Sequence, residues 1–183
     1  LQVVDIANPM HPQVVGSVVT PDRVSEVAIS GSHAYVADSA AGLLVIDVTN
    51  PSSPQVVGSV DTPGYAFGVA VSGHHAYVAD HTGELRVIDI TNPAHPQNVG
   101  GFEVSDSAFG LAVSGSYAYV TTGWYFQVVD ITDPAHPRIV SSDIVLFGAY
   151  NVVIAGTWAY VSSWERGFGV IDVSNPAQPQ WVG

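Results

Sequence analysis

The feature that most constrains this chain is a repeat of about 42 residues that runs through the whole sequence. The segment LLVIDVTNPSSPQVVG at 43–58 recurs as LRVIDITNPAHPQNVG at 85–100 and as FQVVDITDPAHPRIVS at 126–141. Related copies stand at 1–16 and 168–183. Such a chain repeats one small structural unit, and each unit buries its apolar faces against its neighbours.

Two markers show how regular the repeat is. An aspartate recurs at Asp5, Asp47, Asp89, Asp130 and Asp172. The tyrosine of an Ala-Tyr-Val segment follows each of the first four aspartates by thirty residues, at Tyr35, Tyr77, Tyr119 and Tyr160. The spacing shortens once, by a single deletion between Tyr119 and Asp130.

Each repeat predicts four β-strands. In the stretch 67–104 these are FGVAVSG, HAYVAD, LRVIDI and QNVGGFEV. Valine and the other β-branched residues favour strands, and no segment shows the apolar spacing of a helix. Four-stranded units of this length are typical of β-propeller blades, which are covered on both faces. We therefore predict an all-β chain that forms a propeller with four-stranded blades.

The strand pattern predicts four full blades and one half blade. The approximate boundaries are 1–19 for the half blade and 20–60, 61–103, 104–145 and 146–183 for the blades. Because the first copy supplies only the third and fourth strands, we expect the chain to be part of a larger or multi-chain propeller. Other chains or further blades would then cover its open ends, since uncovered sheet edges promote aggregation.

The repeated strands resemble a known family. LLVIDV, LRVIDI and FGVIDV, followed by Thr/Ser-Asn-Pro-x-x-Pro, resemble the LVIVD repeat over essentially the whole chain. The resemblance implies a β-propeller and a secreted or cell-surface protein of a bacterium or archaeon. It implies nothing about an activity.

Charge and cysteine content exclude several classes of partner and site. Sixteen acidic residues face four arginines and no lysine, for a net charge of −12. Nucleic acids and anionic membranes require clustered basic residues, so we expect neither as a partner. The chain has no cysteine, which excludes disulfides, thiolate metal sites and cysteine nucleophiles. The longest apolar run, at 144–155, is too short to insert in a membrane.

The recurring polar residues favour structural roles. Each repeated aspartate stands just before an Asn-Pro or Asp-Pro turn, where its carboxylate can accept backbone N–H groups. His11, His95 and His136 share one position of this turn in separate blades, too far apart for one metal site. His75 is expected in the core. We expect no cofactor and no metal.

The connections that differ between repeats are the candidate binding surface. The links between blades and those between second and third strands vary, whereas the other two turns are nearly uniform. In an antiparallel blade the two variable connections emerge at the same end, and binding residues commonly lie on such loops. The candidates are Arg23, Tyr65, His81, Trp124, Tyr125, Phe147, Trp164 and Arg166. The alternative is that these aromatic side chains only cover the loops or the mouth of the channel.

These observations favour a non-catalytic binding or scaffolding module that holds a protein or a glycan on aromatic loops. A first alternative is a glycan-active enzyme that uses loop carboxylates such as Glu84, Glu165 or Asp106. A second alternative is a purely structural element of a larger assembly. No nucleophile elbow, zinc-protease motif or phosphate-binding loop is present.

Overall fold

The structure, a computed structural model, describes residues 1–145, 148–165 and 167–183. These residues form strands and connections without a helix, as the sequence predicts, and none of them forms a helix able to cross a bilayer. The first sheet has two strands, β1 (Gln2–Asp5) and β2 (Gln13–Ser17).

Four sheets of four strands follow along the chain. The first holds β3 (Glu26–Ser30), β4 (His33–Ala37), β5 (Leu43–Asp47) and β6 (Gln55–Val60). The second holds β7 (Ala66–Ser72), β8 (His75–Asp80), β9 (Glu84–Asp89) and β10 (Gln97–Glu103). The third holds β11 (Ala108–Ser114), β12 (Tyr117–Thr122), β13 (Tyr125–Asp130) and β14 (Arg138–Val145). The fourth holds β15 (Ala149–Ala155), β16 (Trp158–Ser163), β17 (Gly167–Asp172) and β18 (Gln180–Trp181).

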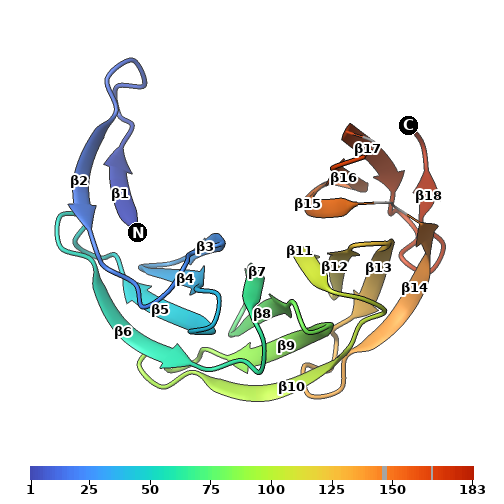
Figure 1. The fold of residues 1–183 in the computed structure, drawn as a ribbon, viewed down its shortest axis with the longest axis horizontal. Coiled ribbons are helices and arrows are strands. Elements are labelled where there is room, and N and C mark those ends of the chain that lie inside the picture. The colour runs from blue at the N-terminus through green and yellow to red at the C-terminus, as the bar shows by residue number, and fades with distance from the viewer. Residues whose placement is uncertain (146–147, 166) are drawn as a thin grey trace.

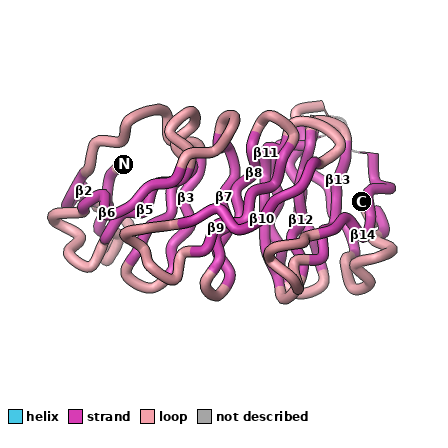
Figure 2. Tube along the Cα trace, turned by 90° about the horizontal axis from the view of Figure 1, so that it is seen from below, coloured by secondary structure: helices cyan, strands magenta, loops and turns pink. Residues whose placement is uncertain are grey.

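The sheets stand around an arc that does not close into a ring (Figure 1). Within each sheet, consecutive strands pair antiparallel, and β3, β7, β11 and β15 line the inside of the arc. The last strands of the sheets form its outer side, and the two chain ends lie at the two ends of the arc. Seen from the side, the connections gather along two opposite rims (Figure 2).

The core lies between neighbouring sheets. Leu43 and Val45 of the first sheet pack with Val78 and Ile88 of the second, and similar clusters join the second to the third and the third to the fourth. Three of the four repeated tyrosines belong to these clusters: Tyr35, Tyr77 and Tyr119 are buried, and burial raises the pKa of each phenol. The fourth, Tyr160, is only half-buried. These three tyrosines therefore pack between neighbouring sheets.

The repeated aspartate, and the Asn or Asp that precedes the first proline, hold the outer turn of each copy as the sequence predicts. Asp47 Oδ1 accepts the Thr49 N–H at 2.8 Å, and Asn50 Oδ1 accepts the Ser52 N–H at 3.2 Å. The same pair of bonds recurs in the other four copies. His75, in contrast, is half-buried rather than part of the core, because it lies at the exposed start of β8.

A glycine in the outer strands β2, β6 and β10 lets their sheets approach the next one closely. A Cβ atom on Gly58 would lie 2.2 Å from the Pro93 carbonyl oxygen, which belongs to the turn of the following sheet. Gly16 and Gly100 face Pro51 and Pro134 in the same way. The glycine that ends the Gln-Val-Val-Gly segment is therefore required by packing between sheets.

Candidate functional site

The variable connections lie at one rim, where backbone hydrogen bonds join them to one another. The His81 N–H donates to the Tyr65 carbonyl at 2.9 Å, and the Ala66 N–H donates to Ser39 at 2.9 Å. In the fourth sheet the Trp164 N–H donates to the Gly148 carbonyl at 2.9 Å. We call this the loop rim; it contains the links between sheets and the links between their second and third strands.

Two buried aspartates fix the loops of this rim. Asp38 Oδ2 accepts the Asp22 N–H at 2.9 Å, and Asp80 Oδ2 accepts the Gly64 N–H at 2.9 Å. Both acids are fully buried at the end of the second strand of their sheets. The sequence analysis missed their role, although the repeated segment Ala-Tyr-Val-Ala-Asp contains them both. In the third sheet Thr122 takes this place, and its Oγ1 accepts the Tyr125 N–H at 2.9 Å.

Five rings form a continuous row along the loop rim, which we call the aromatic band: Phe67, His81, Phe109, Tyr150 and Trp164. The His81 ring lies 5.1 Å from Phe67 and 5.2 Å from Phe109, measured between ring centroids. Phe67 and Phe109 are 5.8 Å apart, Phe109 and Tyr150 also 5.8 Å, and Tyr150 and Trp164 5.6 Å. The band therefore crosses three sheets without interruption.

The inner strands supply the centre of the band. Phe67, Phe109 and Tyr150 are the second residues of β7, β11 and β15, so the repeat places them at equivalent positions. None of the three is among the eight candidates selected from the sequence. The available signal was the recurrence of Ala-Phe-Gly, Ala-Phe-Gly and Ala-Tyr-Asn after three variable loops.

A hollow of about 90 Å³ opens beside the band. It is lined by Ser25, Glu26, Phe67, Phe109, Gly110, Tyr150 and Asn151. Glu26 lies half-buried at the start of β3, and its Oε2 accepts the Val69 N–H at 2.9 Å. Burial raises the pKa of this carboxyl group, and the hydrogen bond from Val69 opposes that rise.

Glycine lets the inner strands meet at this hollow. A Cβ on Gly68 would stand 2.7 Å from the Phe109 carbonyl oxygen and 3.3 Å from Glu26 Oε2. A Cβ on Gly110 would stand 2.6 Å from the Asn151 Cα. The carboxylate of Glu26 thus occupies the space beside β7 that a side chain at position 68 would fill.

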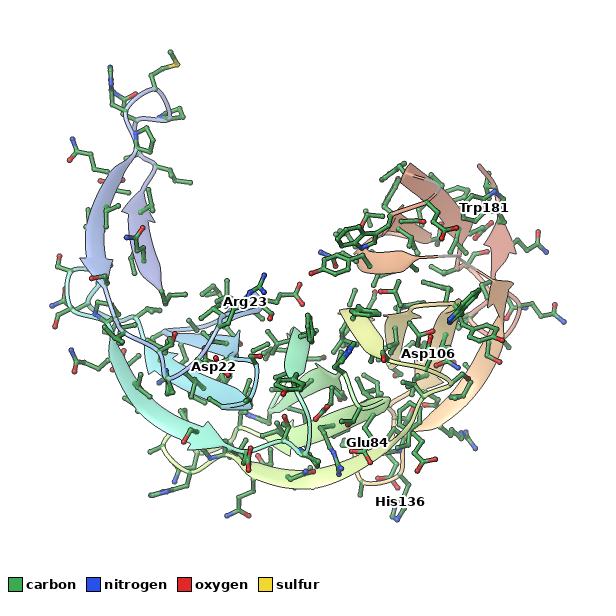
Figure 3. The ribbon with its side chains drawn as sticks, viewed as in Figure 1. Asp22, Arg23, Glu84, Asp106, His136 and Trp181 are labelled. Atoms are coloured by element: carbon green, nitrogen blue, oxygen red, sulfur yellow. The ribbon has the colours of Figure 1, made fainter. Side chains whose placement is uncertain are left out.

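Of the eight residues selected from the sequence, the structure brings His81 and Trp164 into the aromatic band. Tyr65 is 52% exposed, and its carbonyl group holds the His81 loop. Trp124 is also 52% exposed, and Tyr125 is half-buried at the start of β13. Arg23 lies exposed beside the inner strand β3 (Figure 3). Phe147 and Arg166 lie outside the described residues.

The loop carboxylates do not form one group. Glu84 and Asp106 line a second hollow of about 420 Å³ on the loop rim, together with Glu103. Glu84 forms an ion pair with Arg86 of the same strand. Glu165 is exposed in the connection between β16 and β17 and does not line that hollow.

The histidines of the outer turns lie away from the loop rim. His136 is on the outer side of the arc (Figure 3), where its Nδ1 lies 3.0 Å from Asp133 Oδ2. His11 and His95 take the same place in the turns of other sheets. Within the described ranges, no three His, Asp or Glu side chains come together in a way that could hold a metal ion.

Comparison with known families decides the relationship of the chain. The LVIVD repeat matches at residues 1–20, 22–62, 63–104, 106–143 and 148–183. The chain belongs to the LVIVD-repeat family. No curated protein sequence matches this LVIVD-repeat protein.

Solved structures similar to this LVIVD-repeat protein support its fold. The computationally designed Ika4 protein is 11% identical, with a TM-score of 0.72 over 88% of this chain and 99% of the other. A functionally unknown protein from Desulfotomaculum acetoxidans is 13% identical, with a TM-score of 0.77 over 93% of this chain and 58% of the other. The β-propeller domain of Myceliophteria thermophila Cps50 (Swd1) is 13% identical, with a TM-score of 0.70 over 91% and 60%. The LVIVD-repeat protein thus spans about three-fifths of the last two.

Proposed function

We propose that this LVIVD-repeat protein is a non-catalytic binding module that holds a protein or glycan ligand on its aromatic band. The observation that carries the proposal is the unbroken contact of five rings across three sheets at the loop rim. Trp164 ends the band with 80% of its surface exposed, and Tyr150 is also exposed.

The physical argument is that a rigid scaffold presents these rings. The buried sheets fix the backbone of Phe67, Phe109 and Tyr150, so little conformational freedom is lost when a ligand binds. Aromatic side chains contribute much contact area for few rotatable bonds and dominate the energetics of many interfaces. A solvent-exposed tryptophan beside such a row offers a face for stacking on a sugar or an apolar side chain.

Mutation of the exposed end of the band tests the proposal. The wild-type protein should bind a ligand on glycan or peptide arrays, and the Trp164→Ala and Tyr150→Ala variants should not bind it. Trp158→Ala is the matched control, because Trp158 is also partly exposed but follows the turn between β15 and β16, at the opposite rim. Arrays on which the wild type binds nothing, or binding that Trp164→Ala leaves unchanged, would contradict a glycan or peptide ligand on the aromatic band.

A second candidate function is assembly with a second copy of this chain. Its support is the exposed apolar face of the fourth sheet, where Val153 is 60% and Phe168 65% exposed. Between the other sheets, corresponding faces are covered by a sheet of the same repeat. Sedimentation should then show concentration-dependent association that Phe168→Arg removes and Trp164→Ala retains. A wild-type monomer at all concentrations would contradict this role.

We further propose that the protein acts outside the cytoplasm, as a secreted or cell-surface module of a bacterium or archaeon. The resemblance of its repeats to proteins of that location supports this assignment. Fractionation of cells that express the complete gene, with detection by an antibody to this segment, tests it; recovery in the cytoplasm alone would contradict it.

A further inference from the structure

The hollow beside Glu26 has the most specific chemistry of the loop rim. Three aromatic rings, from Phe67, Phe109 and Tyr150, form much of its wall. Among the residues that line it, Glu26 is the one with a formal charge. A ligand in the hollow therefore meets aromatic surface, the neutral polar side chains of Ser25 and Asn151, and a single carboxylate.

The carboxylate has no cationic partner in the part of the chain that the structure describes. Its Oε2 accepts one backbone N–H, from Val69, and none of the ion pairs there includes Glu26. Arg23 stands three residues earlier and is exposed, but it too forms no ion pair in that part of the chain. A half-buried carboxylate without a counter-charge is stabilised by any cation that reaches it.

The surroundings favour a cation over other ligands. The face of an aromatic ring carries negative electrostatic potential and attracts ammonium groups within about 6 Å of its centroid. The chain as a whole carries a net charge of −12, which repels anions. A divalent metal ion is commonly held by more than one charged ligand, whereas among the described residues the hollow offers one carboxylate beside the neutral Ser25 and Asn151.

We propose that this hollow binds a methylated ammonium group, with Glu26 as its charge partner and Phe67, Phe109 and Tyr150 as its aromatic wall. Methyl groups contact the rings and need no hydrogen-bond acceptor, which suits the aromatic part of the wall. The inference rests on the proposed function, because these three rings belong to the aromatic band, and it names the chemistry of the ligand. The group arrives either as a free quaternary ammonium ion or as a trimethylated lysine of a protein.

Choline and its uncharged isostere 3,3-dimethyl-1-butanol are the probes that test the role of charge. Calorimetric or NMR titration of the wild type should show choline binding roughly tenfold more tightly than the isostere. Glu26→Gln should weaken choline binding roughly tenfold or more, because it removes the charge and keeps the shape. The matched control, Glu103→Gln, removes an equal charge from the same rim outside this hollow and should bind as the wild type does.

Phe109→Leu tests the aromatic wall, since leucine keeps apolar volume and removes the ring face. It should weaken choline binding and leave binding of the isostere nearly unchanged, with an unaltered melting temperature showing that the variant is folded. A trimethyl-lysine peptide compared with its unmodified form then distinguishes the two sources. Binding of that peptide favours a protein ligand, and binding of choline without it favours a free ion.

Equal affinity for choline and the isostere, or a Glu26→Gln variant that binds choline as the wild type does, would overturn the inference. The two proposals can fail separately. If Trp164→Ala removes an array ligand while choline neither binds nor competes with it, the binding function stands and the cation site does not. If choline binds and depends on Glu26 while the arrays stay blank, the cation site stands without the array ligand.

Discussion

At the scale of single residues, the turn aspartates act through short hydrogen bonds rather than through burial. Asp130 is the strongest case: the hydroxyl and N–H of Thr132 donate to its Oδ1 at 2.6 and 2.9 Å. Arg138 adds a bond to Oδ2 at 2.9 Å. Together these donors lower the pKa of Asp130 to about 2.

The donors differ in how much each lowers the pKa of Asp130, and NMR titration of this carboxyl group can rank them. Thr132→Val removes the hydroxyl, the largest of the causes, and should raise the pKa of Asp130 more than Arg138→Gln does. Asp172 is the internal control, because its donors come from Ser174 and neither substitution touches them. An Asp130 pKa that stays near 2 in Thr132→Val would show that the hydroxyl contributes nothing.

The same carboxyl groups predict how stability depends on acidity. The pKa values of Asp47, Asp89, Asp130 and Asp172 are lower in the folded chain than the ordinary value of 3.8 for an aspartate. Their stabilisation is therefore present above the pKa of the unfolded chain and is lost as pH falls through the folded values, down to about 2 for Asp130.

Urea unfolding between pH 6 and pH 2 measures this loss. The wild type should lose stability steadily below about pH 4. A variant with asparagine at all four positions keeps an oxygen acceptor for each turn and should show a flatter profile over that range. Equal slopes for the two proteins would mean that other groups cause the acid sensitivity.

At the scale of strands and turns, the glycines of the outer strands control how sheets fit together. Gly58→Ala would press a methyl group against the Pro93 carbonyl oxygen. This oxygen belongs to the backbone, so the clash is relieved only if the strand or the turn shifts. We expect a loss of about 1–3 kcal/mol in the free energy of unfolding. Chemical denaturation measures it, with Gly123→Ala as control: there the nearest atom is the flexible carboxylate end of Asp106, at 2.9 Å. Similar losses in both variants would exclude the packing explanation.

Most of the strands and turns could be predicted from the sequence, because their signals are local and recur in every copy of the repeat. The Asp-x-x-Asn-Pro turns and the rich valine content carry this information. The aromatic band could not be predicted in the same way. Whether Phe109 points into a core or toward Phe67 and Tyr150 depends on how closely inner strands approach, and Gly68 and Gly110 set that distance only in three dimensions.

The candidate site could be predicted only in part, because comparison of the repeats locates loops but not the side chains that meet between strands. Variation between repeats located the loop rim and, with it, His81 and Trp164. Glu26 has no counterpart in the sister repeats, where Gly68, Gly110 and Asn151 take its position; this difference assigns it to the variable rim but does not distinguish it from the other residues there. Its significance follows from the hollow into which the inner strands place it.

At the scale of the whole molecule, stability depends on contacts between successive sheets. Leu111 is buried in the cluster that joins the second sheet to the third. Leu111→Ala should cost about 2–5 kcal/mol through lost apolar contact and the cavity that remains. Because each sheet touches only its neighbours, Leu111→Ala should also uncouple the unfolding of the two halves of the arc.

Hydrogen exchange can detect that uncoupling as two groups of amides with different protection, in place of one. Ile29→Ala is the control, since Ile29 on β3 is 64% exposed and its loss should change the unfolding free energy little. A Leu111→Ala variant that still unfolds in one transition, with uniform protection, would show that the sheets are coupled by more than this cluster.

The contact between an outer-strand glycine and the next proline turn also bears on curvature. In the first three copies the missing side chain lets the outer strand approach the next proline turn closely, so we expect the angle between these sheets to respond to this position. In the third repeat that position is Ser141, whose buried hydroxyl has no hydrogen-bond partner among the described residues. Larger side chains there would hold the sheets apart and widen the circle they follow. We therefore expect substitutions at this one position of each repeat to change the curvature of the arc.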